Sequence, residues 1–503
     1  RVAKGVRGER GLEPPQGARC CGGPRDELEH AVHVRFHLVV GLRVRPRQLV
    51  PAAVRDVRRA RHRGAVHAAA GLSADRDLPA LQPKRHVQRV SVRVAEDRVR
   101  KCDDEDRYDT GILRAMTHTP LYGRIFPDEL EAQRSALAED PDLAEFLASR
   151  QALATDPYRP LFHFSPPQGM MNDPNGLCQW QGRFHMFYQF RPQWGKPDNE
   201  NRVHWGHTVS DDLVRWTDLP PALYPTTEHH CYSGQTLVEP DRVIAIYHGT
   251  ESGNSIATAT DPLLLNWAKH PDNPVIPMVP IDADGSPYRV FDPCIWKEED
   301  GYYAISGTYK DGELRADCRA IDHLFRSSDL ATWEHIGTLI EGGFHSEPGE
   351  DGAVPNFWPI GDGRHMMLFF SHKRAGQYYI GTYDRETHRL NPERFGRMNY
   401  GAFATGSLHA PTATVDDQGR YIGVFNVKEG RAGTAWTDVM TLPRHYWLGS
   451  DASLRMAPVE EIESLRGDEV IVDSMEIPGN TEIPIDTVNG KALEIQAVID
   501  PGE

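Results

Sequence analysis

Short runs of aromatic and β-branched residues, separated by turn-forming residues, dominate the chain from residue 162 to about residue 454. Gln181-Gly182-Arg183 precedes the apolar run at residues 184–188, and Gln418-Gly419 precedes the run at residues 421–425. A tight turn between two β-prone runs is the signature of a β-hairpin. The pattern therefore predicts an all-β region of nearly 300 residues.

A loose repeat runs through this region, in which a Ser/Thr-Asp step is followed by an apolar turn and a tryptophan. The copies are Ser210-Asp211-Asp212 to Trp216, Thr260-Asp261 to Trp267 and Ser328-Asp329 to Trp333, with Thr382-Tyr383-Asp384 as a degenerate fourth. The tryptophans are 51 and 66 residues apart, a spacing that suits a four-stranded propeller blade with its loops. An aspartate before a tryptophan also occurs in other hairpin proteins, but three copies in phase with the hairpins favour a propeller over a sandwich.

The two flanks of the β-rich region have different patterns. Leucine and phenylalanine recur at helical spacing among charged residues from Pro127 to about Ala154, which predicts helix there. After residue 457, the runs at 470–472 and 493–499 are typical of strands. About 45 residues are too few for a self-sufficient sandwich.

The first hundred residues differ in composition from the remainder. They contain 22 basic and 10 acidic residues and one aromatic residue, Phe36, whereas the remainder contains 34 basic and 62 acidic residues. The first methionine is Met116. One interpretation is a disordered basic arm that binds a polyanion, and the favoured one is that residues 1–115 are not part of the native protein. The predicted division is 1–115, a helical segment 116–160, a propeller 161–456, and a linker with an incomplete β-sandwich 457–503.

Charge and cysteine content exclude several classes of function. The net charge of −16 argues against nucleic-acid binding, which requires a basic surface. No run approaches the ~18 apolar residues of a membrane span, and no signal-peptide core is recognisable, so no membrane association and a cytoplasmic location are expected. The seven cysteines include no Cys-x-x-Cys pair and are interpreted as reduced thiols. His204 and His207 are spaced as structural residues in a strand, so no metal and no cofactor are expected.

Three acidic positions stand beside large apolar residues. Asp173 lies in Asn172-Asp173-Pro174-Asn175-Gly176, which could equally form a functionless turn; Asp292 follows Phe291, and Glu350 precedes Asp351. Acids in apolar surroundings are either satisfied by local N–H groups or have perturbed pKa values suited to acid–base chemistry. Glycoside hydrolysis uses such a pair, one carboxylate as nucleophile and one acid as proton donor. Tryptophans 194, 205 and 358 would then offer flat faces for sugar rings.

These segments, in this order, resemble glycoside hydrolase family 32, which contains the invertases, inulinases and levanases. The resemblance covers roughly residues 161–466. Its elements are Met171-Asn172-Asp173-Pro174-Asn175-Gly176, Gln189, Trp194-Gly195, His204-Trp205-Gly206-His207, Tyr232-Ser233-Gly234 and Met440-Thr441-Leu442-Pro443-Arg444. It implies a five-bladed β-propeller followed by a β-sandwich, of which this chain holds only a truncated start.

The resemblance also implies roles for individual residues. Asp173 would be the nucleophile, Asp292 the transition-state stabiliser and Glu350 the general acid/base. The implied sugar contacts are Asn172, Gln189, Trp194, Trp205, Tyr232, Ser233 and Phe291. Two departures stand out: Phe291 replaces the arginine of the family's Arg-Asp-Pro, with Arg289 as a possible substitute, and Glu347 competes with Glu350 for the acid role.

The predicted function is that of a retaining glycosidase that cleaves terminal β-fructofuranosyl bonds in sucrose or short fructans through a covalent fructosyl-enzyme. Fructosyl transfer to another sugar is the alternative within the enzymes, because it needs the same three acids. A sugar-binding propeller that has lost catalysis is the alternative from another class, suggested by the missing arginine and the truncated end.

Overall fold

The computed structural model describes residues 32–40, 124–192, 202–278, 288, 290–307, 322–341, 347, 350–399, 407–428, 435–478, 480–486, 488–490 and 492–500. The chain divides into two compact units. One comprises residues 44–464, and the other combines residues 1–43 with residues 465–503. Each unit is described by itself.

The larger unit contains five sheets, whose strands are antiparallel except where β21 pairs with β2. The first comprises β2 (Gly169–Trp180), β3 (Arg183–Arg191), β4 (His204–Ser210), β5 (Thr217–Leu223) and, beside β2, β21 (Trp436–Thr437). The second comprises β6 (Cys231–Val238), β7 (Val243–Gly249), β8 (Gly253–Ala259), β9 (Ala268–Lys269) and β10 (Ile276–Pro277). The third comprises β11 (Pro293–Glu298), β12 (Gly301–Ser306), β13 (His323–Ser327) and β14 (Glu334–Thr338). The fourth comprises β15 (Ala353–Gly361), β16 (Arg364–Ser371), β17 (Ala375–Asp384) and β18 (Arg389–Arg397). The fifth comprises β19 (Leu408–Val415), β20 (Tyr421–Val427), β22 (Val439–Met440), β23 (Arg444–Leu448) and β24 (Leu454–Pro458).

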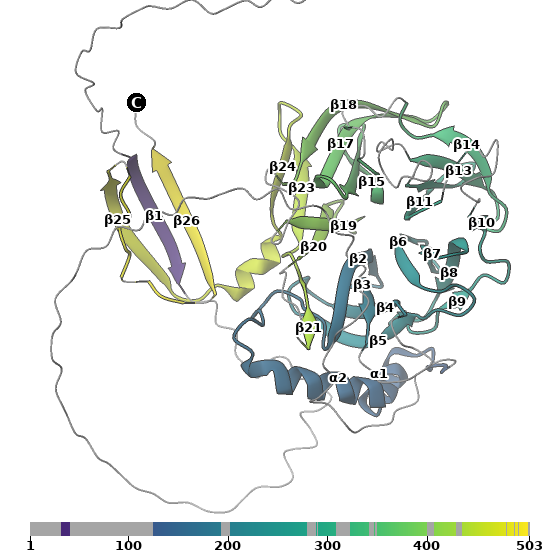
Figure 1. Cartoon of the computed structure of the whole chain (residues 1–503), viewed down its shortest axis with the longest axis horizontal. Coiled ribbons are helices and arrows are strands. Elements are labelled where there is room, and N and C mark those ends of the chain that lie inside the picture. The colour runs from purple at the N-terminus through teal and green to yellow at the C-terminus, as the bar shows by residue number, and fades with distance from the viewer. Residues whose placement is uncertain are drawn as a thin grey trace, which may run out of the picture. The chain divides into compact units, whose positions relative to one another are not determined.

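The sheets are the blades of a five-bladed β-propeller, as predicted (Figure 1). Their first strands, β2, β6, β11, β15 and β19, contact one another in cyclic order around the central axis. Residues that begin these inner strands therefore gather at one end of the axis, although they are far apart in the sequence.

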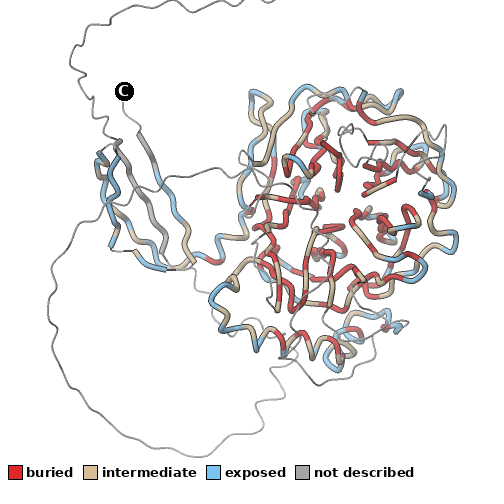
Figure 2. The backbone as a smooth tube through the Cα atoms, in the orientation of Figure 1, coloured by how far each residue is buried: buried red, intermediate tan, exposed pale blue. Residues whose placement is uncertain are grey.

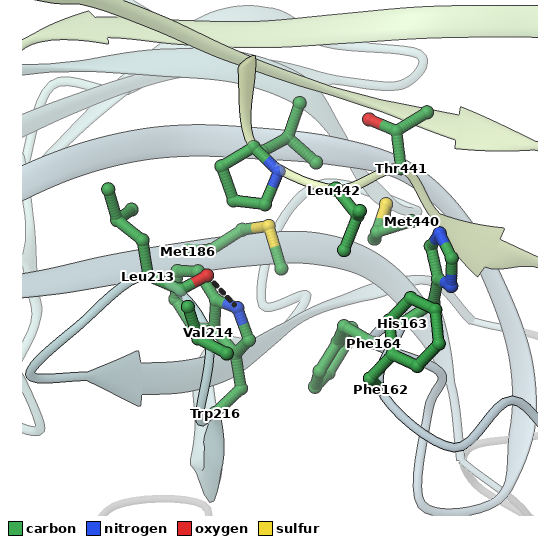
Figure 3. Close-up of a pocket in the computed structure, with 12 residues that line it drawn as sticks. Phe162, His163, Phe164, Met186, Leu213, Val214, Trp216, Met440, Thr441 and Leu442 are labelled. Carbon is green, nitrogen blue, oxygen red and sulfur yellow. Dashed lines mark hydrogen bonds between the residues drawn. The ribbon is translucent and has the colours of Figure 1, made fainter. Parts of the chain in front are cut away.

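The ring closes between blade 1 and blade 5. β21 pairs in parallel with the start of β2, and the Gly169 N–H donates to the Ala435 carbonyl at 2.9 Å. The Met440 N–H donates to the Phe164 carbonyl at 2.9 Å. Figure 3 shows the small apolar pocket at this seam, where Met186 and Trp216 of blade 1 lie opposite Met440 and Leu442. The segment around Met440 thus takes part in the closure.

Local turn chemistry explains the hairpins and the repeat. Gln181 and Gly182 have φ values of 48° and 78°, as a two-residue turn of type I′ between strands requires. In each of the three repeat copies the tryptophan indole N–H donates to a leucine carbonyl three residues earlier, at 2.8–3.1 Å. These leucines, Leu213, Leu264 and Leu330, all have positive φ. The repeat is therefore one recurring turn at the outer part of a blade.

Apolar packing joins the blades pairwise. Five separate clusters of buried residues fill the junctions between blades 1 and 2, 2 and 3, 3 and 4, 4 and 5, and 5 and 1. Figure 2 shows that the buried residues are concentrated within the propeller. Burial of this kind contributes about 25 cal/mol per Å² and holds the inner strands in register.

The predicted helical segment forms two helices, α1 (Leu130–Ala138) and α2 (Pro141–Ala152), followed by a short 3₁₀ turn, η2 (Leu153–Thr155). Asp140 separates them, because its side chain caps α2 by accepting from the Asp142 and Leu143 N–H groups. Pro141 occupies the first position of α2, where a missing N–H does no harm. Residues 116–123 of this segment lie outside the described residues.

The smaller unit is a three-stranded sheet in the order β25 (Glu469–Ile477), β1 (Val32–Val40) and β26 (Leu493–Asp500). The two strands predicted after residue 457 are present. A strand from the basic leader lies between them, a pairing that the composition of the leader did not predict. A 3₁₀ helix, η4 (Glu460–Leu465), follows β24.

Candidate active site

Asp173 lies at the centre of a polar network on the inner strand of blade 1. Its Oδ2 accepts hydrogen bonds from Ser233 Oγ at 2.6 Å and Gln189 Nε2 at 3.1 Å. Gln189 Nε2 also contacts Ser233 Oγ at 2.6 Å, and Asn172 Nδ2 donates to Gln189 Oε1 at 3.1 Å. Four of the predicted site residues are therefore joined by hydrogen bonds.

Backbone irregularities place these side chains. The pairing of β2 with β3 shifts register between Met171 and Pro174, so that Asn172 and Asp173 lie in a bulge. Bulges commonly re-aim side chains next to functional sites. Ser233 lies in a second bulge, and the following Gly234 allows the strands to approach, because a Cβ there would lie 2.0 Å from the Ile246 carbonyl oxygen.

The environment of Asp173 is a balance of opposing effects. Burial raises the pKa of Asp173 above its ordinary value, while the Ser233 hydrogen bond and the positive charges of Lys428 and His372 lower it. Its exposure is nevertheless intermediate, so that the carboxylate is not sealed off. A partly desolvated carboxylate that is held by donors is suited to nucleophilic attack.

Asp292 lies directly before β11 and is buried. Its Oδ2 accepts the Val354 N–H at 3.1 Å, which ties it to the start of β15. Asp292 and Asp173 both act on Tyr232: burial raises the pKa of Tyr232, the charge of Arg191 lowers it, and the negative charges of Asp173 and Asp292 raise it. Tyr232 therefore lies near both carboxylates.

Glu350 lies three residues before β15 and is fully buried. Its two oxygens accept from the Glu347 N–H at 2.7 Å and from Gln377 Nε2 at 3.2 Å. Among the described residues, the Oε1 of Gln377 has no hydrogen-bond partner. The Oε1 of a rotated Gln377 amide would accept a hydrogen bond from the protonated carboxyl group of Glu350, so Gln377 is able to satisfy either protonation state of Glu350.

Glu347 has a different environment. Its carboxylate pairs with Arg374 at 2.9 Å, and with Arg397 and Lys373 at 3.3 Å each. Hydrogen bonds from these cations lower the pKa of Glu347 to about 2. A carboxylate with so low a pKa is a poor proton donor near neutral pH, which favours Glu350 for that role.

The remaining predicted contacts have different outcomes. Trp205 is fully buried, packs against Phe187 and Tyr247, and donates its indole N–H to the Tyr232 carbonyl at 2.8 Å. Because its ring is covered, Trp205 lies behind the site and supports Tyr232. Trp194 and Arg289 lie outside the described residues.

Phe291 and Trp358, which were also predicted to contact sugar, pack against other parts of the propeller. Phe291 packs against the buried cluster at the start of β15 and lies 5.4 Å from the His248 ring, measured between ring centroids. Trp358 is the sixth residue of β15, and its indole N–H donates to the Ala413 carbonyl at 3.1 Å. It lines a hollow with Gln179 and Thr414, near the end of the inner strands away from Glu350.

Three polar side chains at the site were not predicted from the sequence. Lys428, directly after β20, contacts Asn172. The positive charge of Arg191 lowers the pKa of Tyr232, against the effect of burial. His372 Nδ1 lies 2.7 Å from Asp351 Oδ2, and its charge acts on Asp173. No motif surrounds these residues in the sequence, and only the fold brings them to Asp173.

The histidines in the predicted strand have structural roles. His207 Nε2 lies 3.0 Å from His185 Nδ1, and burial lowers the pKa of His185 to about 3 and that of His204 to about 4. No group of three or more potential metal ligands occurs within the described part of the chain. Cys178, Cys231 and Cys294 are buried free thiols.

Comparisons with known proteins identify the family of this chain. Residues 163–458, more than half of the chain, match the model of the glycosyl hydrolases family 32 N-terminal domain. The chain belongs to this family.

Relatives within the family carry related names. An insoluble beta-fructofuranosidase isoenzyme 2 of Oryza sativa subsp. indica is 28% identical over 388 residues, which cover 68% of this chain and 61% of that protein. A fructan 6-exohydrolase of Beta vulgaris is 27% identical over 386 residues, 68% of this chain and 61% of the relative. This chain thus spans about three-fifths of the length of these curated relatives.

Solved structures give the same result. The GH32 beta-fructofuranosidase BmSUC1 of Bombyx mori has a TM-score of 0.52 and 30% identity, and the match covers 67% of this chain and 72% of that chain. Fructan 1-exohydrolase IIa from Cichorium intybus has a TM-score of 0.52 and 28% identity, and the match covers 61% of this chain and 62% of that chain.

Among the helices that the structure describes, none is long and apolar enough to cross a membrane.

Proposed function

We propose that the protein is a retaining β-fructofuranosidase that releases terminal fructosyl units from sucrose or short fructans. The observation that carries the proposal is the Asp173 carboxylate, held by Ser233 and Gln189 near the start of the inner strand of blade 1. Asp292 directly precedes the inner strand of blade 3, and Glu350 precedes that of blade 4, so the three acids converge on one end of the axis.

Each acid has a role in the proposed reaction. Asp173 attacks the anomeric carbon of the fructosyl unit, and the bond to the leaving oxygen breaks as Glu350 transfers its proton to that oxygen. Glu350 then removes a proton from water, whose oxygen displaces Asp173 from the same carbon. Asp292, buried and anchored by the Val354 N–H, stabilises the positive charge that develops on the sugar.

The sugar contacts follow from the same network. Asn172, Gln189 and Ser233 offer amide and hydroxyl groups beside the nucleophile, and Tyr232 lies near both Asp173 and Asp292. The positive charge of Arg191 acts on Tyr232, so Arg191 would supply the cation that Phe291 lacks. Relatives support the substrate class: a mutant of BmSUC1 was solved in complex with sucrose, and a variant of the chicory exohydrolase in complex with 1-kestose.

Fructose release from sucrose tests the proposal. The full chain is expected to release fructose and glucose, and Asp173→Asn is expected to lose at least ~10³-fold in kcat, because no covalent intermediate forms without the carboxylate. Proton NMR of the first product is expected to show retained anomeric configuration. Full activity in Asp173→Asn would refute the assignment.

Two alternatives have distinct outcomes in the same assay. A fructosyltransferase would form trisaccharides at high sucrose concentration while releasing little free fructose. A propeller that has lost catalysis would bind fructosides in calorimetry without cleaving them. The network around Asp173 favours the enzyme, because a lapsed site has no need for two donors on one carboxylate.

The C-terminal residues belong to the same proposal. We propose that β25 and β26 belong to the start of a β-sandwich after the propeller, as the family resemblance implies.

A further inference from the structure

Lys428 lies at the end of β20 in blade 5 and reaches the inner strand of blade 1. Its Nζ donates to Asn172 Oδ1 and to Asp438 Oδ2, the latter at 2.9 Å. Its side chain is 30% exposed, and that of Asp438 is 9% exposed. The ammonium group is therefore held between a buried anion and the residue next to Asp173.

The contacts of Lys428 continue as a directional chain of hydrogen bonds. An ammonium group has three donors and no acceptor. Asn172 must therefore turn its oxygen towards Lys428, and its Nδ2 then points to Gln189 Oε1, at 3.1 Å. Gln189 in turn presents Nε2, and not its oxygen, to Asp173.

The orientation of the two amides matters because either is able to rotate. A free Gln189 could equally present Oε1 to Asp173, and an oxygen against a carboxylate is repulsive. Asn426 Nδ2 also faces Asn172 Oδ1, at 3.4 Å, but Asn426 is itself an amide that is able to rotate. Lys428, in contrast, has only donors, so it fixes the direction of this series of hydrogen bonds.

We propose that Lys428 is a positioning residue for the nucleophile, which orients the amides of Asn172 and Gln189 so that they donate towards Asp173. The proposal deepens the proposed function and rests on Asp173 being the nucleophile. The positive charge of Lys428 acts in the same direction, because it favours the ionised form of Asp173. Asp438 anchors the ammonium group from the opposite side.

Three substitutions separate orientation from charge. Lys428→Met removes both, Lys428→Arg keeps a donor-only cation, and Lys428→Gln keeps the polarity but adds an acceptor and removes the charge. We expect kcat/KM on sucrose to fall about 10- to 100-fold in Lys428→Met, the value of a hydrogen bond to a charged group. Lys428→Arg is expected to restore most of it, and Lys428→Gln to be intermediate.

The pH profile of kcat/KM distinguishes a positioning role of Lys428 from a merely structural one, because a structural role would leave the acid limb unchanged. Asp173 attacks as the carboxylate, so its titration sets the acid limb of kcat/KM. Loss of a nearby cation raises the pKa of Asp173, and the acid limb of Lys428→Met is expected to move to higher pH. Among the described residues, the titratable groups that act on Asp173 or on which it acts are Lys428 from blade 5, His372 from the turn between β16 and β17, and Tyr232 of β6.

Lys297→Met is the matched control, because Lys297 also pairs with one carboxylate, that of Glu239, but lies on β11 away from Asp173. It is expected to leave the profile unchanged. A Lys428→Met protein with the wild-type acid limb would overturn the proposal, whether or not its kcat/KM falls.

A second measurement keeps the proposal independent of turnover. Carboxyl ¹³C NMR of labelled aspartate, with the Asp173 signal assigned through Asp173→Asn, reports the pKa of Asp173 without substrate. A higher pKa in Lys428→Met and a near wild-type pKa in Lys428→Arg support the positioning role. If the wild-type chain released no fructose but these shifts were present, the proposed function would fail, and only the effect of Lys428 on the pKa of Asp173 would stand.

Discussion

At the residue scale, the segment from Glu347 to Asp351 places three acids in three environments. Glu347 pairs with three cations, and Glu350 accepts two N–H hydrogen bonds. The carboxylate of Asp351 contacts both the backbone N–H and the imidazole of His372. Sequence spacing left Glu347 and Glu350 as competitors. Their surroundings separate them, because only Glu350 has a neighbour, Gln377, that is able to serve both protonation states.

Glu350→Gln is expected to lower kcat on sucrose by about 10²- to 10⁴-fold, the usual contribution of a general acid. The loss is expected to be much smaller on an aryl fructoside, whose leaving group needs no proton. Glu347→Gln is expected to show no such dependence on the leaving group, since its carboxyl group is already ionised at neutral pH. Kinetics on the two substrates check this. If Asp351→Asn, and not Glu350→Gln, shows the dependence, the acid is Asp351.

At the element scale, the sequence predicted the repeated turn but not the hydrogen bonds and backbone conformation that form it. The copies share an aspartate that accepts backbone N–H groups and a tryptophan that closes on a leucine carbonyl. The positive φ of Leu213, Leu264 and Leu330 could not be predicted, because leucine rarely adopts it. The surrounding hydrogen bonds and burial impose that conformation.

Asp261 is the aspartate of the second repeat copy, and its carboxylate accepts several hydrogen bonds. Its buried carboxylate accepts from the Leu265 and Asn266 N–H groups and from Gln133 of α1 at 2.7 Å. Asp261→Ala leaves these donors unpaired and is expected to reduce the free energy of unfolding by about 2–4 kcal/mol. Urea denaturation measures the loss. Asp211→Ala, at a position with an 83% exposed side chain, is the control and is expected to change stability by less than ~0.5 kcal/mol.

At the scale of the whole molecule, one short strand closes the ring. Trp436 of β21 is fully buried, donates its indole N–H to Asp156 at 2.8 Å, and lies with its ring centroid 5.1 Å from the Arg159 guanidinium carbon. The closure therefore joins blade 1, the end of blade 5 and the segment after α2. Propeller stability depends on this seam, because an open ring would expose the apolar faces of two blades.

Trp436→Ala is expected to destabilise the protein by about 3–5 kcal/mol, since a large cavity would form at the closure. Trp436→Phe keeps most of the packing but loses the bond to Asp156, so a smaller loss is expected. Thermal unfolding with activity as a second probe measures both. Trp447→Ala, at a residue that is 38% exposed, is the control; an equal loss there would contradict a special role for the closing strand.

The sequence by itself determined the β-hairpins and the propeller class, because turn chemistry and strand alternation are local. It also made Asp173 the leading candidate for the nucleophile, through the resemblance of the Asn-Asp-Pro-Asn-Gly motif to the family's, and that role stays a prediction. Only the tertiary structure decided which residues surround that carboxylate. Lys428 and Asn172 are 256 positions apart in the chain, and the hydrogen bond that Lys428 donates to Asn172 forms only because blade 5 packs against blade 1. The burial of Trp205 behind Tyr232 was decided in the same way, because it results from packing between strands and not from a motif.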